Sequence, residues 1–176
     1  MELWDVLDEN RVPTGRLAVR GEGLNPGEYH LVCDIWVMNS RGEYLLSKRS
    51  PNKHFPLMWE PTGGSAVAGE DSYTTAIRET EEEIGLNLEG CEGHCLFSLR
   101  RDKRAVPSFK DVWLFFAEAD TMELKLQEEE VCEARWVSEA TLREMISQGE
   151  VMDLSLYLEE FIEKSKFLLT LRPKLD

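Results

Sequence analysis

Residues 63–86 read GGSAVAGEDSYTTAIRETEEEIGL, and this stretch decides the fold. Asp71 or Ser72 is predicted to be a helix N-cap, because a short side-chain oxygen there accepts hydrogen bonds from the free amides of a first turn. Gly85 is predicted to end the helix, since glycine readily adopts the left-handed conformation that closes one. The intervening positions that recur at helical spacing on one face are Tyr73, Ala76, Ile77, Thr80 and Ile84. The stretch therefore predicts a glycine-rich loop followed by an amphipathic helix.

Three carboxylates lie on another part of the same helix. Glu79, Glu82 and Glu83 are spread over about 100° of its circumference. Like charges one turn apart repel and weaken a helix. A hard divalent cation with oxygen ligands would offset that repulsion. The alternative is a solvated acidic face, which is common in Glu-rich helices.

The spacing of the charged residues and glycines distinguishes this helix from an ordinary acidic one. The pattern is Gly64, five residues, Glu70, seven residues, Arg78-Glu79, two residues, Glu82-Glu83, one residue, Gly85 and then an apolar residue. This pattern resembles the signature of the Nudix hydrolase family. The resemblance implies an α/β (α+β) fold, namely a Nudix-type α/β/α sandwich with a mixed central sheet. Thr80 departs from the usual aliphatic residue, and we expect its hydroxyl to bond back to the helix backbone.

The resemblance also implies a metal site. Glu79, Glu82, Glu83 and Gly63, whose carbonyl approaches closely because glycine has no side chain, would hold Mg²⁺ or Mn²⁺. The catalytic candidates are Glu82, Glu79 and Glu130, the last of three consecutive glutamates late in the chain. The sequence does not separate them as general base, and a solvated charge run remains the alternative for Glu130.

Four residues of the signature are expected to act structurally. Glu70 and Arg78 would tie the loop to the helix, because a planar guanidinium suits a paired carboxylate. Gly64 and Gly85 would allow a tight loop and a helix end.

Four further residues are candidates for substrate binding. Arg49 lies on the predicted strand before the signature, and Arg101 and Arg104 lie in a basic cluster over residues 100–110. Trp59 is either a core or pocket-wall residue or one that stacks on the substrate. The alternatives for the arginines are a half-buried strand surface and a solvated hairpin tip whose charges protect edge strands.

The chain is predicted to be a single domain over residues 1–176, with N-terminal strands in 1–28 and a C-terminal helical segment over 138–170. We expect strands at 3–8, 29–38, 43–49, 93–101, 108–119 and 134–137, a short strand within 120–127, and helices at 139–148 and 154–169. The last helix either completes the core or pairs with a second subunit, which leaves a homodimer open.

Composition limits the partners. The net charge of −14 argues against nucleic acid and against an anionic membrane surface as partners. The chain has no apolar run long enough to cross a bilayer and no signal-peptide core at its start, so we expect a cytoplasmic protein. Cys91 and Cys95 are expected to be small buried thiols in a strand rather than a zinc site.

The predicted function is hydrolysis of a diphosphate bond that joins a nucleoside diphosphate or similar small molecule to another group. The opening ELWDVLDENRVPTGR and the segment KHFPLMWEPTGGS also resemble the branch related to isopentenyl diphosphate isomerase. The isomerase places a catalytic cysteine just before the signature, and residues 59–69 contain none. A third alternative is a nucleotide-sensing module without catalysis, although all the signature carboxylates are present.

Overall fold

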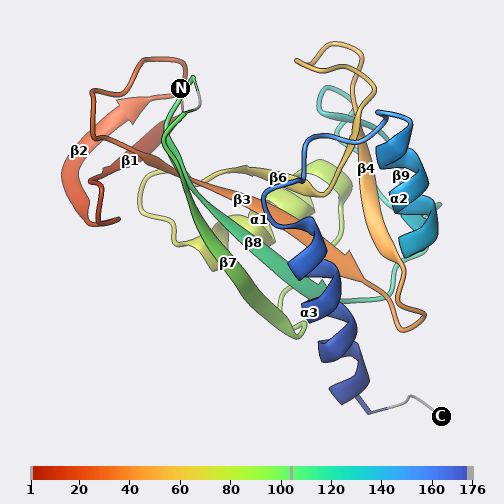
Figure 1. Cartoon of the computed structure of the whole chain (residues 1–176). Helices are drawn as coiled ribbons and strands as arrows, with labels where there is room; N and C mark the ends of the chain where they lie inside the picture. Colours follow the sequence, from red (N-terminus) through yellow and green to blue (C-terminus); the bar gives the residue numbers. More distant parts are fainter. Residues whose placement is uncertain (1, 104, 174–176) are drawn as a thin grey trace.

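The structure, a computed structural model, describes residues 2–103 and 105–173 (Figure 1). The elements in chain order are β1 (Leu3–Leu7), β2 (Pro13–Val19), β3 (His30–Met38), β4 (Tyr44–Arg49), β5 (Trp59–Glu60), β6 (Thr62–Ser65), α1 (Ser72–Ile84), β7 (Gly93–Arg101), β8 (Ser108–Phe116), β9 (Val131–Val137), α2 (Glu139–Ser147) and α3 (Leu158–Leu171).

The central sheet is mixed. Its strand order is β5-β4-β3-β8-β7, with β6 paired to β3 and β9 paired to β4. β3 and β8 run parallel from the His30–Ser108 pair to the Met38–Phe116 pair, whereas the other pairings are antiparallel. β1 and β2 form a separate hairpin. The predicted fold class is therefore confirmed.

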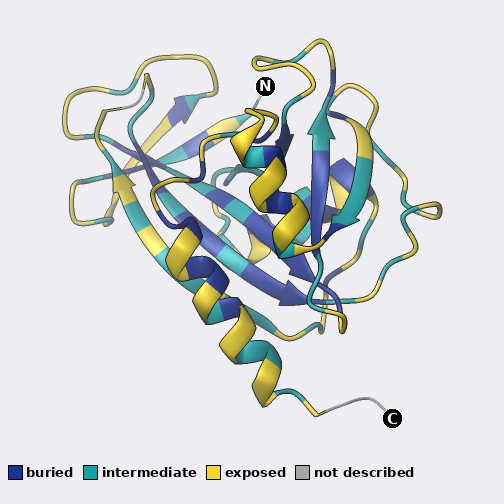
Figure 2. Cartoon of the chain, turned by 45° about the vertical axis from the view of Figure 1, so that its right-hand side comes forward, coloured by how far each residue is buried: buried dark blue, intermediate teal, exposed yellow. Residues whose placement is uncertain are grey.

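β3 is the centre of the fold because both of its faces are buried. Trp36 and Met38 pack into one hydrophobic cluster with residues of α2 and α3. Ile35 and Val37 point the other way, into a second cluster with residues of α1. Successive side chains of a strand alternate between faces, so a strand with apolar residues on both faces needs cover on both sides. The result is an α/β/α arrangement, with the exposed faces of the helices turned outward (Figure 2).

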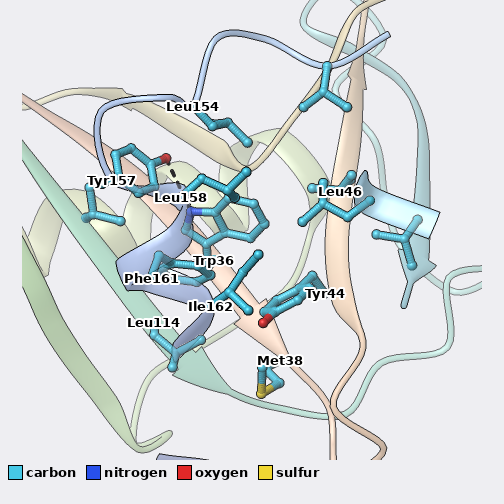
Figure 3. Close-up of a cluster of buried hydrophobic side chains, with 14 of the residues drawn as sticks. Trp36, Met38, Tyr44, Leu46, Leu114, Leu154, Tyr157, Leu158, Phe161 and Ile162 are labelled. Carbon is cyan, nitrogen blue, oxygen red and sulfur yellow. Dashed lines mark hydrogen bonds between the residues drawn. The ribbon is translucent and has the colours of Figure 1, made fainter. Parts of the chain in front are cut away.

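Aromatic packing attaches α3 to the sheet (Figure 3). The ring centroids of Trp36 and Phe161 lie 4.5 Å apart, and the Tyr44 ring packs edge-on to Trp36. The Tyr44 hydroxyl lies 2.8 Å from Ser165 Oγ, and Trp36 Nε1 donates to the Tyr157 hydroxyl at 3.3 Å. The polar groups of Trp36, Tyr44, Tyr157 and Ser165 therefore have partners inside this layer, as buried polar groups require.

Three sequence-based expectations were wrong in detail. The last helix begins at Leu158 rather than 154, because Tyr157 has φ of −146° and turns its ring into the core. Residues 120–127, all of them described, contain turns and no strand. Cys95 is exposed and Cys91 half-buried, so they are not two buried strand thiols.

The helices of the described residues, 2–103 and 105–173, include none that is long and apolar enough to span a bilayer.

Replacing Phe161 by alanine should lower the free energy of unfolding by about 3–5 kcal/mol, because the ring is fully buried and leaves a cavity. Phe167 provides a control on the same helix, since it is 63% exposed. Urea unfolding of F161A and F167A would measure both. Equal and small losses would contradict this account of the core.

Candidate metal and active site

The ends of α1 are fixed by local side chains. Asp71 is the N-cap, and its carboxylate accepts a hydrogen bond from the Thr74 amide at 2.8 Å. Gly85 closes the helix with φ of 69°. The same turn leaves no room for a side chain, because a Cβ there would lie 2.9 Å from the Lys125 amide nitrogen. Both ends were predictable because a cap depends on neighbouring residues only.

The buried face of α1 differs in one position from the predicted one. Ala76, Thr80 and Ile84 are fully buried, whereas Tyr73 is 40% exposed. The Thr80 hydroxyl donates to the Ala76 carbonyl at 2.8 Å, as expected for a threonine inside a helix.

A guanidinium joins the glycine loop to α1. Arg78 Nε donates to Glu70 Oε1 at 2.7 Å, and Arg78 Nη2 donates to Glu70 Oε2 at 2.9 Å and to the Ser65 carbonyl at 3.1 Å. Burial alone would raise the pKa of Glu70, but the hydrogen bonds from Arg78 hold it below its ordinary value. This bidentate pair fixes where α1 begins relative to β6.

Gly64 allows a carboxylate to lie directly on the β6 backbone. A Cβ at Gly64 would lie 2.2 Å from Glu79 Cδ, so any side chain would occupy the place of that carboxylate. Gly63 is equally constrained, because a Cβ there would lie 2.2 Å from the Cys33 carbonyl oxygen on β3. Glu79 also accepts from Arg78 Nη1 at 3.0 Å. Burial raises its pKa.

Glu83 is the most buried carboxylate of the site, with 6% exposure. The Gly63 amide approaches its Oε2 at 3.4 Å. Burial raises the pKa of Glu83 to about 8, with Lys53 opposing that shift and Glu79 and Glu60 adding to it. A carboxylate so poorly hydrated and so close to other acids needs a cation beside it to stay ionised.

Two residues of this site were not found from the sequence. Glu60, on β5, accepts from Arg49 Nη1 at 2.5 Å, and burial raises its pKa. Lys53 Nζ lies 3.8 Å from Glu83 Oε1 and also contacts the Glu130 carboxylate. The sequence indicated Glu60 only through its position three residues before Gly63. It did not indicate Lys53, because Lys53 lies in a polar loop far from the acids in sequence.

Glu82 lies apart from Glu83. Its side chain is 55% exposed and accepts from Arg78 Nη1 at 2.9 Å. Across residues 2–103 and 105–173, no three acidic, thiol or imidazole side chains already converge in an arrangement suited to a metal ion. The expected convergence of Glu79, Glu82 and Glu83 is therefore not seen. The physical reason is that Arg78 draws Glu79 and Glu82 to one side, while Lys53 draws Glu83 to another.

The donors nevertheless fit a hard divalent cation. Each candidate ligand is a carboxylate or a backbone carbonyl, and oxygen donors are what Mg²⁺ and Mn²⁺ prefer. Gly64 leaves space for the Glu79 carboxylate, and Glu83 is poorly hydrated. A divalent cation would stabilise the ionised form of both acids.

A cavity of about 580 Å³ adjoins this acidic cluster at Glu60. Its charged lining includes Asp34 and Lys110, whose ammonium lies 2.6 Å from Asp34 Oδ1. The Tyr157 hydroxyl donates to Asp34 Oδ2 at 2.7 Å. Apolar side chains such as Phe55 complete the walls. The cavity is large enough for a small-molecule group and offers it both apolar and charged surface.

The predicted substrate residues are dispersed. Arg101 lines the cavity. Arg49 is turned toward Glu60 and the His54 carbonyl. Trp59 is 4% exposed, and the Arg135 guanidinium lies 4.2 Å from the centroid of the Trp59 ring. Trp59 is therefore a wall residue beside strands β4 and β9. Arg104 lies outside the described residues.

The fold and this site together define an α/β enzyme domain organised around an acidic loop–helix. The chain belongs to the Nudix hydrolase family, since the NUDIX domain model matches residues 28–154. Nudix hydrolases act on diphosphate-containing compounds and generally need divalent metal cations.

Three comparisons give the degree of similarity. An uncharacterized Nudix hydrolase of Listeria monocytogenes is 38% identical over 152 residues, covering 85% of this chain and 88% of that protein. An isopentenyl-diphosphate Delta-isomerase of Streptomyces griseus is 31% identical, but over 47% of this chain and 43% of its own length. A crystal structure from Deinococcus radiodurans superposes with a TM-score of 0.73 at 21% identity, covering 93% of this chain and 99% of that one, which shows a shared fold.

Replacing Gly64 by alanine should weaken Mn²⁺ binding by about tenfold or more, as expected for disturbing a ligand's orientation. The added methyl group would displace the end of a flexible side chain, Glu79, so the free energy of unfolding should change by less than about 1 kcal/mol. Gly23→Ala is the control, because a Cβ there would meet no described atom within 4 Å. Calorimetric Mn²⁺ titration and urea unfolding test both statements, and unaltered Mn²⁺ affinity in G64A would refute them.

The raised pKa of Glu83 predicts a pH dependence of stability in the presence of a chelator. The folded state binds the Glu83 proton more tightly than the unfolded chain, where the pKa is about 4.5. The resulting stabilisation is complete below pH 4.5 and is lost as the pH rises through about 8. Wild type should therefore lose stability relative to Glu83→Gln between pH 5 and pH 8 in urea unfolding with EDTA. Parallel pH profiles would count against a buried, protonated Glu83.

Proposed function

We propose that this Nudix hydrolase cleaves a diphosphate bond in a Mg²⁺- or Mn²⁺-dependent reaction, with the group attached to the diphosphate seated in the 580 Å³ cavity. The observation that carries the proposal is the placement of half-buried Glu79 and buried Glu83 against Gly64 and Gly63, in an acidic cluster whose Glu60 lines that cavity. A nucleoside diphosphate joined to another moiety has both the anionic and the partly apolar parts that this surface accommodates.

The residues that would hold the cation are Glu79, Glu83 and the Gly63 carbonyl, joined by Glu82 once its side chain turns away from Arg78. When bound, such an ion neutralises diphosphate charge and lowers the pKa of a coordinated water. Glu82 has the freedom to turn, because its side chain is half-exposed and is held, among the described residues, by Arg78. A surface ion pair of this kind contributes at most about 1 kcal/mol.

Glu79, Glu82 and Glu130 are the candidates for the general base. Arg78 fixes the Glu79 carboxylate beside the β6 backbone, and burial raises its pKa. Glu130 is engaged by Lys53, and Glu82 is mostly hydrated. The carboxylate among these three that does not hold the cation would accept the proton of the attacking water. The leaving phosphate would depart toward the cations Arg49 and Arg101, with Arg104 a further candidate.

Glu82→Gln and Glu83→Gln should each reduce kcat/KM for diphosphate hydrolysis by at least about 100-fold, because several kcal/mol of transition-state charge stabilisation is lost. Glu81→Gln is the matched control, since Glu81 is an exposed carboxylate on the same helix. The assay is a panel of nucleoside diphosphate sugars, dinucleotide polyphosphates and coenzyme A with Mg²⁺ or Mn²⁺, read by product mass. Wild-type turnover by a folded Glu83→Gln variant would contradict the proposal.

The partial similarity to an isomerase provides a second candidate function, which the same panel tests when isopentenyl diphosphate is included. Cys33, which pairs with Gly64 across β3 and β6, packs on the α1 face of β3, and its Sγ lies 3.5 Å from the Ser72 carbonyl. Burial raises the pKa of this thiol to about 12. Formation of dimethylallyl diphosphate would establish isomerase activity in spite of this placement.

A further inference from the structure

Lys53 holds together two acids that come from distant parts of the chain. It lies in the loop between β4 and β5, with its ammonium 3.8 Å from buried Glu83 and in contact with Glu130. Its side chain is 22% exposed, so the contact is largely shielded from water. This observation is independent of the Nudix signature, which does not include Lys53.

Backbone hydrogen bonds fix the three segments that meet at this ammonium. The Ser50 amide donates to the Glu130 carbonyl at 2.9 Å, which fastens the Lys53 loop to the acidic turn before β9. The Gln127 amide donates to the Glu83 carbonyl at 2.9 Å, which fastens the same turn to the end of α1. These backbone hydrogen bonds therefore hold the segments that carry Lys53, Glu83 and Glu130 next to one another.

The electrostatics make Lys53 more than a surface ion pair. Glu83 is 6% exposed, and the Lys53 ammonium lies between its carboxylate and that of Glu130. A divalent ion ligated by Glu83 would bring two further positive charges within a few ångströms of the ammonium. Charges at such distances in a shielded site repel strongly, so the two cations exclude each other from these oxygens.

We propose that Lys53 is an internal counter-ion that competes with the divalent metal for Glu83 and Glu130. The inference rests on the metal site proposed above and adds a determinant of metal affinity to it. Lys53 places one positive charge between these acids while no metal is bound, and metal binding requires its ammonium to leave. The long flexible lysine stem permits that exchange, whereas the Arg78 guanidinium, with its several fixed hydrogen bonds, does not.

Mn²⁺ binding to the substrate-free protein, followed by electron paramagnetic resonance, tests the competition. Lys53→Met should bind Mn²⁺ about tenfold more tightly than wild type, a ratio typical of two coupled binding events. Lys53→Arg, which retains the charge, should bind close to wild type. Lys48→Met is the matched control and should be unchanged, because Lys48 pairs at 3.6 Å with exposed Glu133 on the neighbouring strand.

Thermal unfolding supplies a readout that a merely structural lysine would not give. In EDTA, Lys53→Met should melt at a lower temperature than wild type, because the Glu130 carboxylate loses its counter-charge. Saturating Mn²⁺ should then raise its melting temperature by more than it raises that of wild type.

The outcomes separate this inference from the proposed function. If wild type binds Mn²⁺ and Lys53→Met binds it equally or more weakly, Lys53 does not compete, and the inference is overturned while the metal site stands. If neither folded protein binds Mn²⁺, the metal site itself is wrong and the competition falls with it. Tighter binding by Lys53→Met together with unchanged Lys48→Met supports the inference.

Discussion

The close pairing of β6 with β3 at Gly63, which admits no side chain, constrains the position of the glycine loop and of α1. Gly63 can pair with β3 because it has no side chain to collide with the Cys33 carbonyl, and Gly64 leaves the space that the Glu79 carboxylate fills. α1 must therefore lie against β6, and its apolar face then covers one side of β3. The acids are held in place by the same packing that makes the sheet a buried layer.

Arg78 and Lys53 each pair with acids of the site, and the two pairings differ in kind. Arg78 binds Glu70 through two parallel hydrogen bonds and also reaches the Ser65 carbonyl, which makes it a permanent clamp. Lys53 is a point charge on a flexible stem between Glu83 and Glu130. The choice of arginine at one place and lysine at the other separates a structural pairing from an exchangeable one.

The parts that the sequence predicted are those decided by near neighbours. The Asp71 cap, the Gly85 end and the Thr80 hydroxyl bond each involve residues at most four positions apart. The Arg49–Glu60 pair and the Lys53 contacts were missed, because they require the β4–β5 pairing and the acidic turn to be placed first. Trp59 was left undecided for the same reason, since its neighbour Arg135 arrives only with β9.

Selectivity for the group beyond the diphosphate must arise outside the signature. Parallel pairing of β3 with β8 places Asp34 near Lys110, and Tyr157, from the turn before α3, donates to the same carboxylate. A buried ion pair adds little net stability. Under the proposed function, the signature supplies the chemistry of the site, whereas strands β3 and β8 and the segment before α3 line the cavity that holds the attached group.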